Sequence, residues 1–472
     1  MLKSALLILS GQAFSSLLLL LRNLLVARLI SVEDYGIAAT FAISMAIVEM
    51  MTTLGLHQLI IQDSEGEDPR LQSGLQGFHL LRSLFSGILL FFLAQPIAQL
   101  LGVPDIVWAY QLLALVPVIN GLTHFDLYRL QRRMVYLPSI LSSAVPALAS
   151  VLVIWPLWKI YGDYRVMLYS VMLQAALTVG TSHLVAKRRY HLSLDKLVIA
   201  RSLKFGWPLL INNILLFFIF QGEKIIVGEA LGLKDLAIFA MGFTLTLTPS
   251  LLLAGSTQTF FLPQLSAVKD DRPRFDHLAM VTFQSHLFFG ALLVIGVMLF
   301  AEPAIHLVLS TKYASLIPLM TWLAILQALR LFRGGSSTIA LAMGKTGLST
   351  ISNLPRVFSM PIAWYAATHT SNIFVVLWIA IIGEGIGFLI SLFLLRRQLD
   401  LSLAPIILPI SLITTLVGFI AIQAWLTNGS PDRMILSPWT GVPIVVLFTL
   451  ALISMKDLRQ YVAARKSGLP FA

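Results

Sequence analysis

Long runs of apolar residues alternate with short polar segments along almost the whole chain. Most runs reach the roughly 20 residues that an α-helix needs to cross the hydrocarbon core of a bilayer. The pattern predicts about 14 membrane-spanning helices, of which the tenth is short and has an inner end that can extend past Arg330. The predicted spans cover roughly residues 5–27, 36–61, 77–100, 106–126, 139–158, 166–186, 206–228, 237–260, 278–301, 317–329, 349–367, 373–395, 405–426 and 439–455.

Composition agrees with a membrane protein and excludes a soluble one. Hydrophobic residues make up 57% of the 472 residues and charged residues only 12%, which is too apolar for a soluble chain of this length. The segments between the predicted spans are at most roughly 20 residues long, so they cannot hold a soluble catalytic domain. There is no cysteine, which removes disulfides and thiolate metal sites. We expect an all-α polytopic membrane protein with no metal site and no cofactor.

The Lys and Arg residues between the predicted spans are distributed unequally over the two sides of the membrane. The formal net charge is +11. With the N-terminus in the cytoplasm, most Lys and Arg outside the spans fall on the cytoplasmic side, which predicts that both termini are cytoplasmic. The charge is therefore assigned to topology and to contact with membrane lipids, and no nucleic-acid partner is expected. Six of these cations are predicted on the outer side: Arg28, Lys159, Arg165, Lys234, Lys312 and Arg433.

Two pairs of segments repeat in the same order. LISVEDYGIAA (29–39) resembles ALGLKDLAIFA (230–240), and AQPIAQLLG (94–102) resembles AEPAIHLVL (301–309) at nearly the same offset. The repeat predicts two pseudo-symmetric six-helix lobes related by an axis along the membrane normal, an arrangement in which transporters bind substrate near the midplane. The predicted parts are an N-lobe (1–186), a linker (187–205), a C-lobe (206–398), and two appended helices with a cytoplasmic tail (399–472).

The linker has the pattern of a basic amphipathic helix. Leu194, Leu197 and Val198 alternate with Lys196 and Arg201. Such a helix lies in the inner membrane interface, where anionic lipid headgroups hold its basic face. A plain linker with topogenic charges is the alternative.

Seven charged residues fall inside the apolar runs, where each costs roughly 2.5–3.5 kcal/mol on insertion scales. Such residues usually face a cavity. In the first helix, Arg22 borders a polar stripe, and in the seventh, Lys224 shares a face with Asn213. The repeat places Glu223 opposite Arg22, which lowers the positive field of this group. The predicted cavity residues are Arg22, Asn23, Asn213, Phe220, Gln221, Glu223 and Lys224.

The other four buried charges form two candidate pairs. Arg82 with Glu49, and Arg356 with Glu384, are interpreted either as ion pairs within a lobe or as coupling sites. A carboxylate in the membrane can carry a proton or bind a cation, so H⁺ and Na⁺ are the candidate coupling ions. Both interpretations remain open from the sequence.

Signatures of enzymes are absent from the sequence. AMGKT (342–346) resembles part of a phosphate-binding loop, but the required first glycine is replaced by Ile339. A membrane-embedded enzyme, such as a polysaccharide polymerase or an O-acyltransferase, is the rival class. The longest outer segment, about 302–316, is too short for the catalytic loop of such a polymerase. The chain is predicted not to be an enzyme.

Three segments carry a family resemblance: RNLLVARLISVEDYGIAATFAI (22–43), LDKLVIARSLKFGWPLLINNIL (194–215) and GEKIIVGEALGLKDLAIFAMG (222–242). They resemble the Wzx-type repeat-unit flippases of the multidrug/oligosaccharidyl-lipid/polysaccharide (MOP) exporter superfamily. The resemblance implies a two-lobed, MATE-like helical fold around a central cavity. It also implies a role in moving undecaprenyl-diphosphate-linked oligosaccharides across the bacterial inner membrane, for O-antigen, capsule or exopolysaccharide assembly. A polysaccharide polymerase and chain-length machinery are the implied partners.

The residues are compatible with such a cargo. A cationic cavity suits a diphosphate, and Arg binds it better than Lys because its fork is bidentate. A lipid II flippase has nearly the same requirements and stays an alternative. A small-molecule multidrug exporter of the same superfamily is a third, but exporters of cationic drugs favour acidic cavities.

Overall fold

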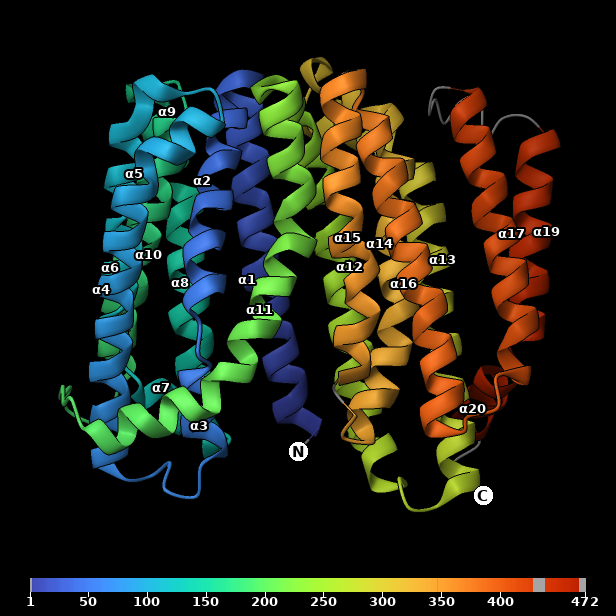
Figure 1. Ribbon diagram of the computed structural model, residues 1–472, viewed down its shortest axis with the longest axis horizontal. Coiled ribbons are helices and arrows are strands. Elements are labelled where there is room, and N and C mark those ends of the chain that lie inside the picture. Colours follow the sequence, from blue (N-terminus) through green and yellow to red (C-terminus); the bar gives the residue numbers. More distant parts are fainter. Residues whose placement is uncertain (1, 346, 428–437, 467–472) are drawn as a thin grey trace. The chain divides into compact units, whose positions relative to one another are not determined.

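The computed structural model describes residues 2–345, 347–427 and 438–466, and every regular element in these ranges is a helix. Arg433, one of the predicted outer cations, lies outside the described residues. The elements are α1 (Leu2–Leu29), α2 (Val32–Thr52), α3 (Leu56–Gln62), α4 (Pro69–Leu100), η1 (Pro104–Ile106), α5 (Val107–Leu113), α6 (Leu115–Asn120), α7 (Asp126–Arg132), α8 (Leu137–Leu152), α9 (Ile154–Ile160), α10 (Arg165–Val185), α11 (Lys196–Leu231), α12 (Leu233–Ala267), α13 (Arg272–Val308), η2 (Thr311–Leu316), α14 (Ile317–Ala342), α15 (Gly347–Thr370), α16 (Ile373–Leu399), α17 (Ala404–Leu426), α19 (Pro438–Ser454) and α20 (Lys456–Lys466) (Figure 1).

The predicted fold class is confirmed: the protein is an all-helical, multi-pass membrane protein. Within the described ranges, 11 helices are long and apolar enough to cross a membrane, or up to 12 if the bent pair α19–α20 forms one span. The predicted count of about 14 is not reached. The fourth predicted span is divided into η1, α5 and α6, and α15 is not among the 11 helices.

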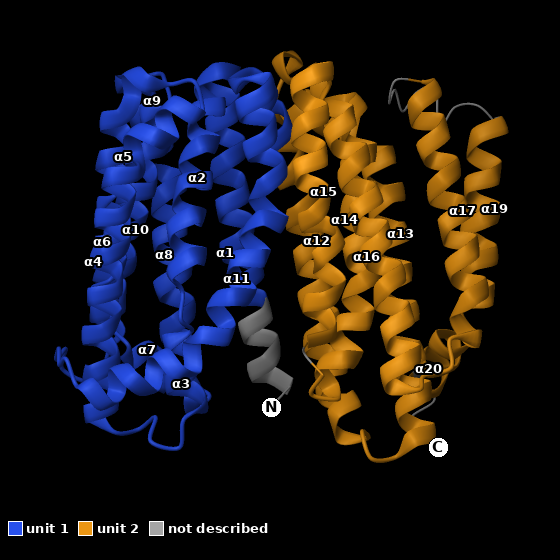
Figure 2. Ribbon diagram, in the orientation of Figure 1, with its two compact units in different colours: residues 1–240 blue, residues 241–472 orange. Residues whose placement is uncertain are grey.

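The chain forms two compact units, residues 1–240 and 241–472 (Figure 2). The boundary falls inside α12, so α11 belongs to unit 1 together with α1–α10. This division follows packing, whereas the lobes predicted from the repeat follow sequence similarity. The repeat itself stays a prediction.

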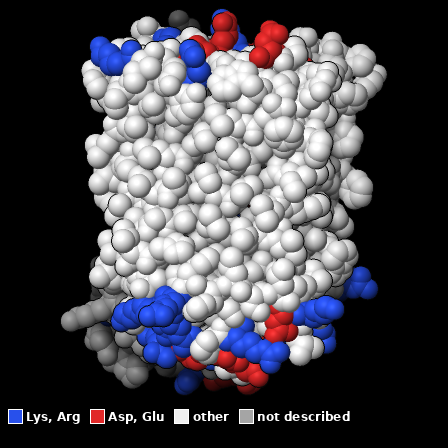
Figure 3. Space-filling view, turned by 90° about the vertical axis from the view of Figure 1, so that its left-hand side faces the viewer, with Lys and Arg blue, Asp and Glu red and all other residues white. Residues whose placement is uncertain are grey.

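A zone without charged side chains crosses the middle of the face that carries α4 and α5 (Figure 3). Figure 3 shows Lys, Arg, Asp and Glu gathered at the two ends of this face, with none across its middle. Large apolar side chains of α4, including Phe85, Ile88 and Phe92, are exposed there. An exposed apolar surface of this kind is stable against lipid tails and not against water.

The second predicted span does not form one helix. It ends at Thr52, and the chain turns through Thr53, Leu54 and Gly55 before α3 begins. Gly55 has φ 64°, a left-handed conformation that glycine adopts without the steric cost of a Cβ atom. A Cβ atom at Gly206 of α11 would lie 2.5 Å from the backbone oxygen of Leu54. The small residue therefore lets α11 pack directly on this α2 break, the segment 53–55.

The predicted amphipathic linker and the seventh span form one element, α11. Asp195 caps it, since its side chain accepts a hydrogen bond from the backbone nitrogen of Leu197 at 2.9 Å. Pro208 lies inside the helix, and proline removes one helical hydrogen bond and bends the axis. In Figure 1 the first part of α11 lies across the base of unit 1, the end that carries α3 and α7, and the rest turns along the other helices.

Ion pairs tie together the segments at the base of unit 1. Glu67, between α3 and α4, lies 2.6 Å from Arg133 and 3.3 Å from Arg129. Asp126 is fully buried and accepts hydrogen bonds from Arg129 Nε at 2.6 Å and from the backbone nitrogen of Lys187 at 2.8 Å. These contacts hold together the α3–α4 loop, α7 and the segment after α10. These segments form the base of unit 1, across which the first part of α11 lies.

Replacing Asp126 with asparagine is expected to destabilise the protein by about 3 kcal/mol, because it leaves Arg129 buried without its nearest carboxylate. Burial raises the pKa of Asp126, but hydrogen bonds from Arg129 and from the backbone of Lys187 outweigh it and lower the pKa below its usual value. A lowered pKa stabilises the fold above the unfolded value of about 3.9, and this contribution is lost as the pH falls through the folded value. Thermal unfolding between pH 7 and pH 3 measures both effects.

Asp163→Asn is the matched control, because the Asp163 pair with Arg165 at 2.7 Å is partly exposed. Exposed pairs contribute at most about 1 kcal/mol. Equal losses in the two variants would contradict a structural role for Asp126.

The C-terminal helix α20 is bent by 69° from α19 and docks on α13 of the same unit. Asp457 accepts a hydrogen bond from Gln284 at 2.9 Å, and the backbone nitrogen of Leu458 donates to Gln284 Oε1 at 2.9 Å. Gln284 is fully buried, and a buried amide is stabilised when both its donor and its acceptor are used. The tail of the described chain is thus anchored to unit 2.

Candidate functional site

All seven predicted cavity residues lie on α1 and α11 of unit 1. The two helices do not pack mainly on each other: α1 packs chiefly on α8, and α11 chiefly on α2. Asn23, Phe220 and Gln221 are half-buried on these helices. Their role in binding stays a prediction.

Arg22 is half-buried in α1 and donates a hydrogen bond from Nη1 to Gln174 Oε1 of α10. Its Nε atom is buried and has no hydrogen-bond partner among the described residues. No carboxylate in the described ranges forms an ion pair with it. A guanidinium at membrane depth with a neutral side-chain partner keeps its positive charge available for an anion.

The sequence did not single out Gln174. It is an isolated amide in the apolar run VMLQAAL (171–177), and this isolation was the available signal. A polar side chain in a span is costly unless it has a partner. Isolated polar residues of the predicted spans are therefore the candidates for the partner of Arg22.

The second part of the predicted cavity lies on α11. Glu223 is buried, with 2% of its surface exposed, and Lys224 is half-buried beside it. Gln221 has a buried Oε1 atom without a hydrogen-bond partner in the described part of the chain. Buried polar atoms are nearly always satisfied, so this oxygen is free to accept a hydrogen bond from a water or a ligand.

Arg82 and Asn213, which were predicted in different groups, meet at the α2 break. Asn213 Nδ2 donates to the backbone oxygen of Thr53 at 3.4 Å. Arg82 Nη1 donates to the hydroxyls of Thr52 at 3.1 Å and Thr53 at 3.5 Å. Asn213 thereby satisfies a backbone carbonyl that the interrupted helix leaves open, whereas Arg82 contacts threonine hydroxyls.

The proposed pair of Arg82 with Glu49 does not form within the described ranges. Glu49 lies on α2 with an exposed side chain, and Arg82 uses its donors on the α2 break. The equivalent pair in unit 2 does form: Arg356 Nη1 lies 3.2 Å from Glu384 Oε2, and both side chains are about 1% exposed. Of the two candidate ion pairs, the one in unit 2 is present in the described residues and the one in unit 1 is not.

A third residue, Arg333, completes the group in unit 2. Its Nη2 lies 3.0 Å from Glu384 Oε1, and its Nη1 donates to Asn353 Oδ1. The tenth predicted span, 317–329, ends before Arg333, with an inner end that can extend past Arg330. In the structure α14 continues to Ala342, and Arg333 lies inside this helix. We call Arg333, Asn353, Arg356 and Glu384 the unit 2 charge cluster.

Two glycines allow the helices of this cluster to approach. A Cβ atom at Gly383 would lie 2.6 Å from Ser359 Oγ, and one at Gly387 would lie 2.5 Å from the backbone oxygen of Ser352. Gly385, between them, has nothing within 4 Å. Gly383 and Gly387 are therefore required for the close packing of α15 on α16.

Gly387→Ala is expected to destabilise the protein by about 1–3 kcal/mol, because the new methyl group collides with backbone. Gly385→Ala is the control on the same helix and should be neutral or stabilising by up to about 1 kcal/mol, since alanine favours helix. Thermal unfolding in detergent compares the two. A larger loss in Gly385→Ala would refute this account of the packing.

Comparisons with known proteins agree with this fold. The succinoglycan biosynthesis transport protein ExoT of Rhizobium meliloti (strain 1021) is 23% identical over 311 residues, which cover 64% of this chain and 61% of ExoT. The match thus spans less than two thirds of that relative.

Two solved structures share the fold at low sequence identity. The lipid II flippase MurJ in its inward closed conformation has a TM-score of 0.69 at 16% identity, covering 98% of this chain and 99% of MurJ. An inward-facing multidrug resistance MATE family transporter of the MOP superfamily has a TM-score of 0.65 at 15% identity, covering 82% and 94%. The MATE-like helical fold expected from the sequence is thereby confirmed.

The family model described as "Polysaccharide biosynthesis protein" matches residues 25–318. This range includes α2–α13. It also includes two of the segments that carry the family resemblance, 194–215 and 222–242, and all but the first three residues of the third, 22–43. Since the match covers more than half of its length, the chain belongs to the polysaccharide biosynthesis protein family.

Proposed function

We propose that the protein is a transporter that flips undecaprenyl-diphosphate-linked oligosaccharide repeat units from the cytoplasmic to the outer leaflet, for surface polysaccharide assembly. The observation that carries the proposal is Arg22. It lies at membrane depth and hydrogen-bonds a neutral amide, Gln174, so a negative charge from the cargo can bind it. A diphosphate accepts two parallel hydrogen bonds from a guanidinium.

The same residues suit the other parts of the cargo. The amides of Asn23, Asn213 and Gln221 offer donors and acceptors to sugar hydroxyls, and the ring of Phe220 offers an apolar face to a sugar ring. Lys224 adds positive charge, while Glu223 limits the field and can accept a hydrogen bond from a hydroxyl. Family membership and the transport role named for ExoT support a lipid-linked sugar as substrate.

We propose the bacterial inner membrane as the location, with both termini in the cytoplasm and flipping by alternating access without a cofactor. A polysaccharide polymerase and chain-length machinery are proposed partners. If an ion drives transport, Glu49 is the better candidate for H⁺ or Na⁺, because its carboxylate is exposed on α2. Glu384 is less suitable, since two guanidiniums already hold it.

Reconstitution tests the proposal. The purified full chain is placed in vesicles with a fluorescent prenyl-diphosphate oligosaccharide, and loss of the fluorophore to a membrane-impermeant quencher measures flipping. We expect flipping of this lipid above that in empty vesicles, and none of a prenyl alcohol without the diphosphate. Equal flipping of both lipids would contradict diphosphate recognition.

A lipid II flippase is the second candidate function, because lipid II carries the same diphosphate and the MurJ fold extends over nearly the whole chain. The vesicle assay distinguishes the two by replacing the repeat unit with lipid II. Transport of a cationic drug in place of either lipid would instead favour a multidrug exporter.

A further inference from the structure

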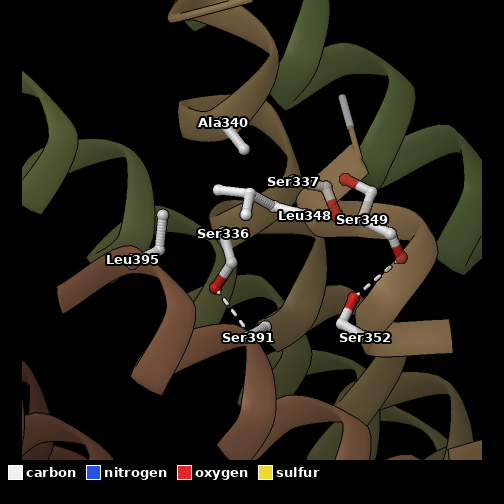
Figure 4. A pocket seen from close by; sticks show the side chains of 8 residues that line it. All are labelled: Ser336, Ser337, Ala340, Leu348, Ser349, Ser352, Ser391 and Leu395. Carbon is white, nitrogen blue, oxygen red and sulfur yellow. Dashed lines mark hydrogen bonds between the residues drawn. The ribbon is translucent and has the colours of Figure 1, made fainter. Parts of the chain in front are cut away.

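The small polar space inside unit 2 has the size of a structural water. It lies among serines of α14, α15 and α16 and has room for about one water molecule (Figure 4). A water there would bridge hydroxyls of neighbouring helices, and a larger ligand does not fit. A more extended binding surface lies on the outside of unit 1, along the first part of α11.

One face of this part of α11 is held against unit 1. Val198, Ser202 and Gly206 are buried and follow one another at a spacing of four residues, which places them on one side of a helix. A Cβ atom at Gly74 of α4 would lie 2.9 Å from Val198 Cγ1, and one at Gly206 would lie 2.5 Å from the backbone oxygen of Leu54. Glycines therefore let the helix approach α4 and the α2 break closely.

Ion pairs secure the same part of α11 to the base of unit 1. Arg201 Nη2 lies 2.6 Å from Asp63 Oδ1, and its Nη1 lies 2.5 Å from Glu65 Oε2. At the start of the helix, Arg70 Nε of α4 lies 2.6 Å from Asp195 Oδ2. Asp195 is the only acidic residue of the segment 187–211, and Arg70 neutralises it.

The opposite face of this part of α11 is exposed. Leu197, Leu203 and Trp207 have 73%, 48% and 62% of their surface exposed. Lys196 and Lys204 are exposed beside them, and neither lysine forms an ion pair among the described residues. With Ala200 between them, these residues form what we call the α11 surface: Lys196, Leu197, Ala200, Leu203, Lys204 and Trp207.

The α11 surface differs from the amphipathic pattern predicted from the sequence. That pattern included Val198 and Arg201, but Val198 is buried against unit 1 and Arg201 is paired with two carboxylates. Lys204 and Trp207 lie on the exposed face in their place. The charges that remain available to a partner are therefore those of Lys196 and Lys204.

Charge and apolar character together restrict the partner. The two lysines are eight residues apart, roughly 12 Å along a helix, and apolar side chains lie between them. A lysine can lay its apolar stem on such a surface and extend its ammonium group to the headgroups of a bilayer. Tryptophan favours the same interface between membrane and water. The α11 surface contains no carboxylate, so it attracts anionic headgroups and offers less to neutral ones.

We propose that the α11 surface binds anionic phospholipids of the leaflet at the base of unit 1. Lys196 and Lys204 contact the lipid phosphates, and Leu197, Leu203 and Trp207 lie among the first carbons of the acyl chains. Arg201 and Arg70 hold the helix in place and are not lipid ligands. The α11 surface shares no residue with the predicted cavity residues, so this proposal does not depend on the proposed function.

Thermal unfolding of the purified full chain in a neutral detergent measures binding, because a ligand of the folded state raises Tm by mass action. Phosphatidylglycerol is compared with phosphatidylcholine of the same acyl chains, and we expect phosphatidylglycerol to raise Tm at lower concentration. Each lysine near anionic lipid contributes roughly fivefold in affinity, so the double variant Lys196→Gln/Lys204→Gln should bind phosphatidylglycerol roughly 30-fold more weakly.

The double variant Lys269→Gln/Lys456→Gln is the matched control, because it removes two exposed lysines of unit 2 and the same net charge. It should bind phosphatidylglycerol like the unchanged protein. Equal weakening in the two double variants would show that net charge, and not the α11 surface, attracts the lipid. That result would overturn the proposal, as would equal effects of the two lipids on the unchanged protein.

A second measurement identifies what covers the surface. The chain has no cysteine, so Ala200→Cys carries a single fluorescent label at the centre of the α11 surface. In phosphatidylglycerol vesicles, brominated acyl chains should quench this label and should not quench a label at Lys269→Cys. Absence of quenching at Ala200→Cys would overturn the proposal. Energy transfer between labelled copies that unlabelled protein abolishes would also overturn it, because a second copy would then cover the surface.

Discussion

We expect Arg22→Ala to abolish surface polysaccharide in cells that depend on this protein, while the amount of protein in the membrane stays normal. The reason is that Arg22 carries a positive charge at membrane depth. Its hydrogen-bond partner, Gln174, is neutral and does not compensate that charge. Truncating one partner of a buried hydrogen-bonded charge pair costs about 2–5 kcal/mol. Since about 1.4 kcal/mol is a factor of ten, flipping should fall at least roughly 30-fold.

Three further variants define the role of this charge. Arg22→Lys keeps the charge but loses the bidentate geometry, so an intermediate rate is expected. Lys224→Ala should also reduce flipping, because it lowers the positive charge on α11. Arg28→Ala, an exposed position on the same helix as Arg22, should export normally. Surface polysaccharide measured beside membrane protein levels tests all four. Normal polysaccharide in both Arg22→Ala and Lys224→Ala would remove the cavity assignment.

Glu384→Gln is expected to be the most destabilising single change. The substitution leaves the guanidiniums of Arg333 and Arg356 in contact with a neutral amide inside unit 2. Breaking a buried ion pair by removing one partner typically costs about 3–5 kcal/mol. The expected result is a large drop in Tm in detergent and a low yield of folded protein.

A double variant separates charge from packing. Adding Arg333→Gln to Glu384→Gln removes one excess positive charge, so it should recover part of the lost stability, as in a double-mutant cycle. Glu49→Gln is the control, because this exposed carboxylate forms no ion pair within the described residues. A drop in Tm for Glu49→Gln as large as that for Glu384→Gln would show that the pairing is not the cause.

The sequence predicted the fold well where apolar runs were long. Helices such as α13 and α16 follow from the length and hydropathy of their apolar runs alone. In lipid, a helix satisfies all its backbone hydrogen bonds within one segment, which a single strand cannot do. Interrupted elements were predicted less well. The α2 break depends on Gly55 and on the tertiary contact of Gly206 with Leu54, which no local pattern reveals.

The buried charges show why the site was harder to predict than the fold. The tenth predicted span ended before Arg333, because an arginine at the end of a short apolar run usually lies in a loop. Its partner Glu384 is distant in sequence. The ion pair that compensates the charge of Arg333 inside the span could therefore not be recognised from the sequence. The pair of Arg82 with Glu49 was predicted from their positions along two helices. Whether a hydrogen bond forms depends on the distance and angle between donor and acceptor in the folded protein.

Because α11 is one continuous helix, it fixes the distance between the base of unit 1 and Lys224. The helix lies along the base of unit 1 up to about Pro208 and then turns, and Lys224 follows 16 residues later. At 1.5 Å per residue this is roughly 24 Å, most of the roughly 30 Å hydrocarbon thickness. The predicted position of the first part of α11 in the headgroup layer would fix the distance of Lys224 from that layer, so transport is expected to respond to bilayer thickness. Thinner or thicker lipids would move this charge relative to the outer surface without altering a single contact.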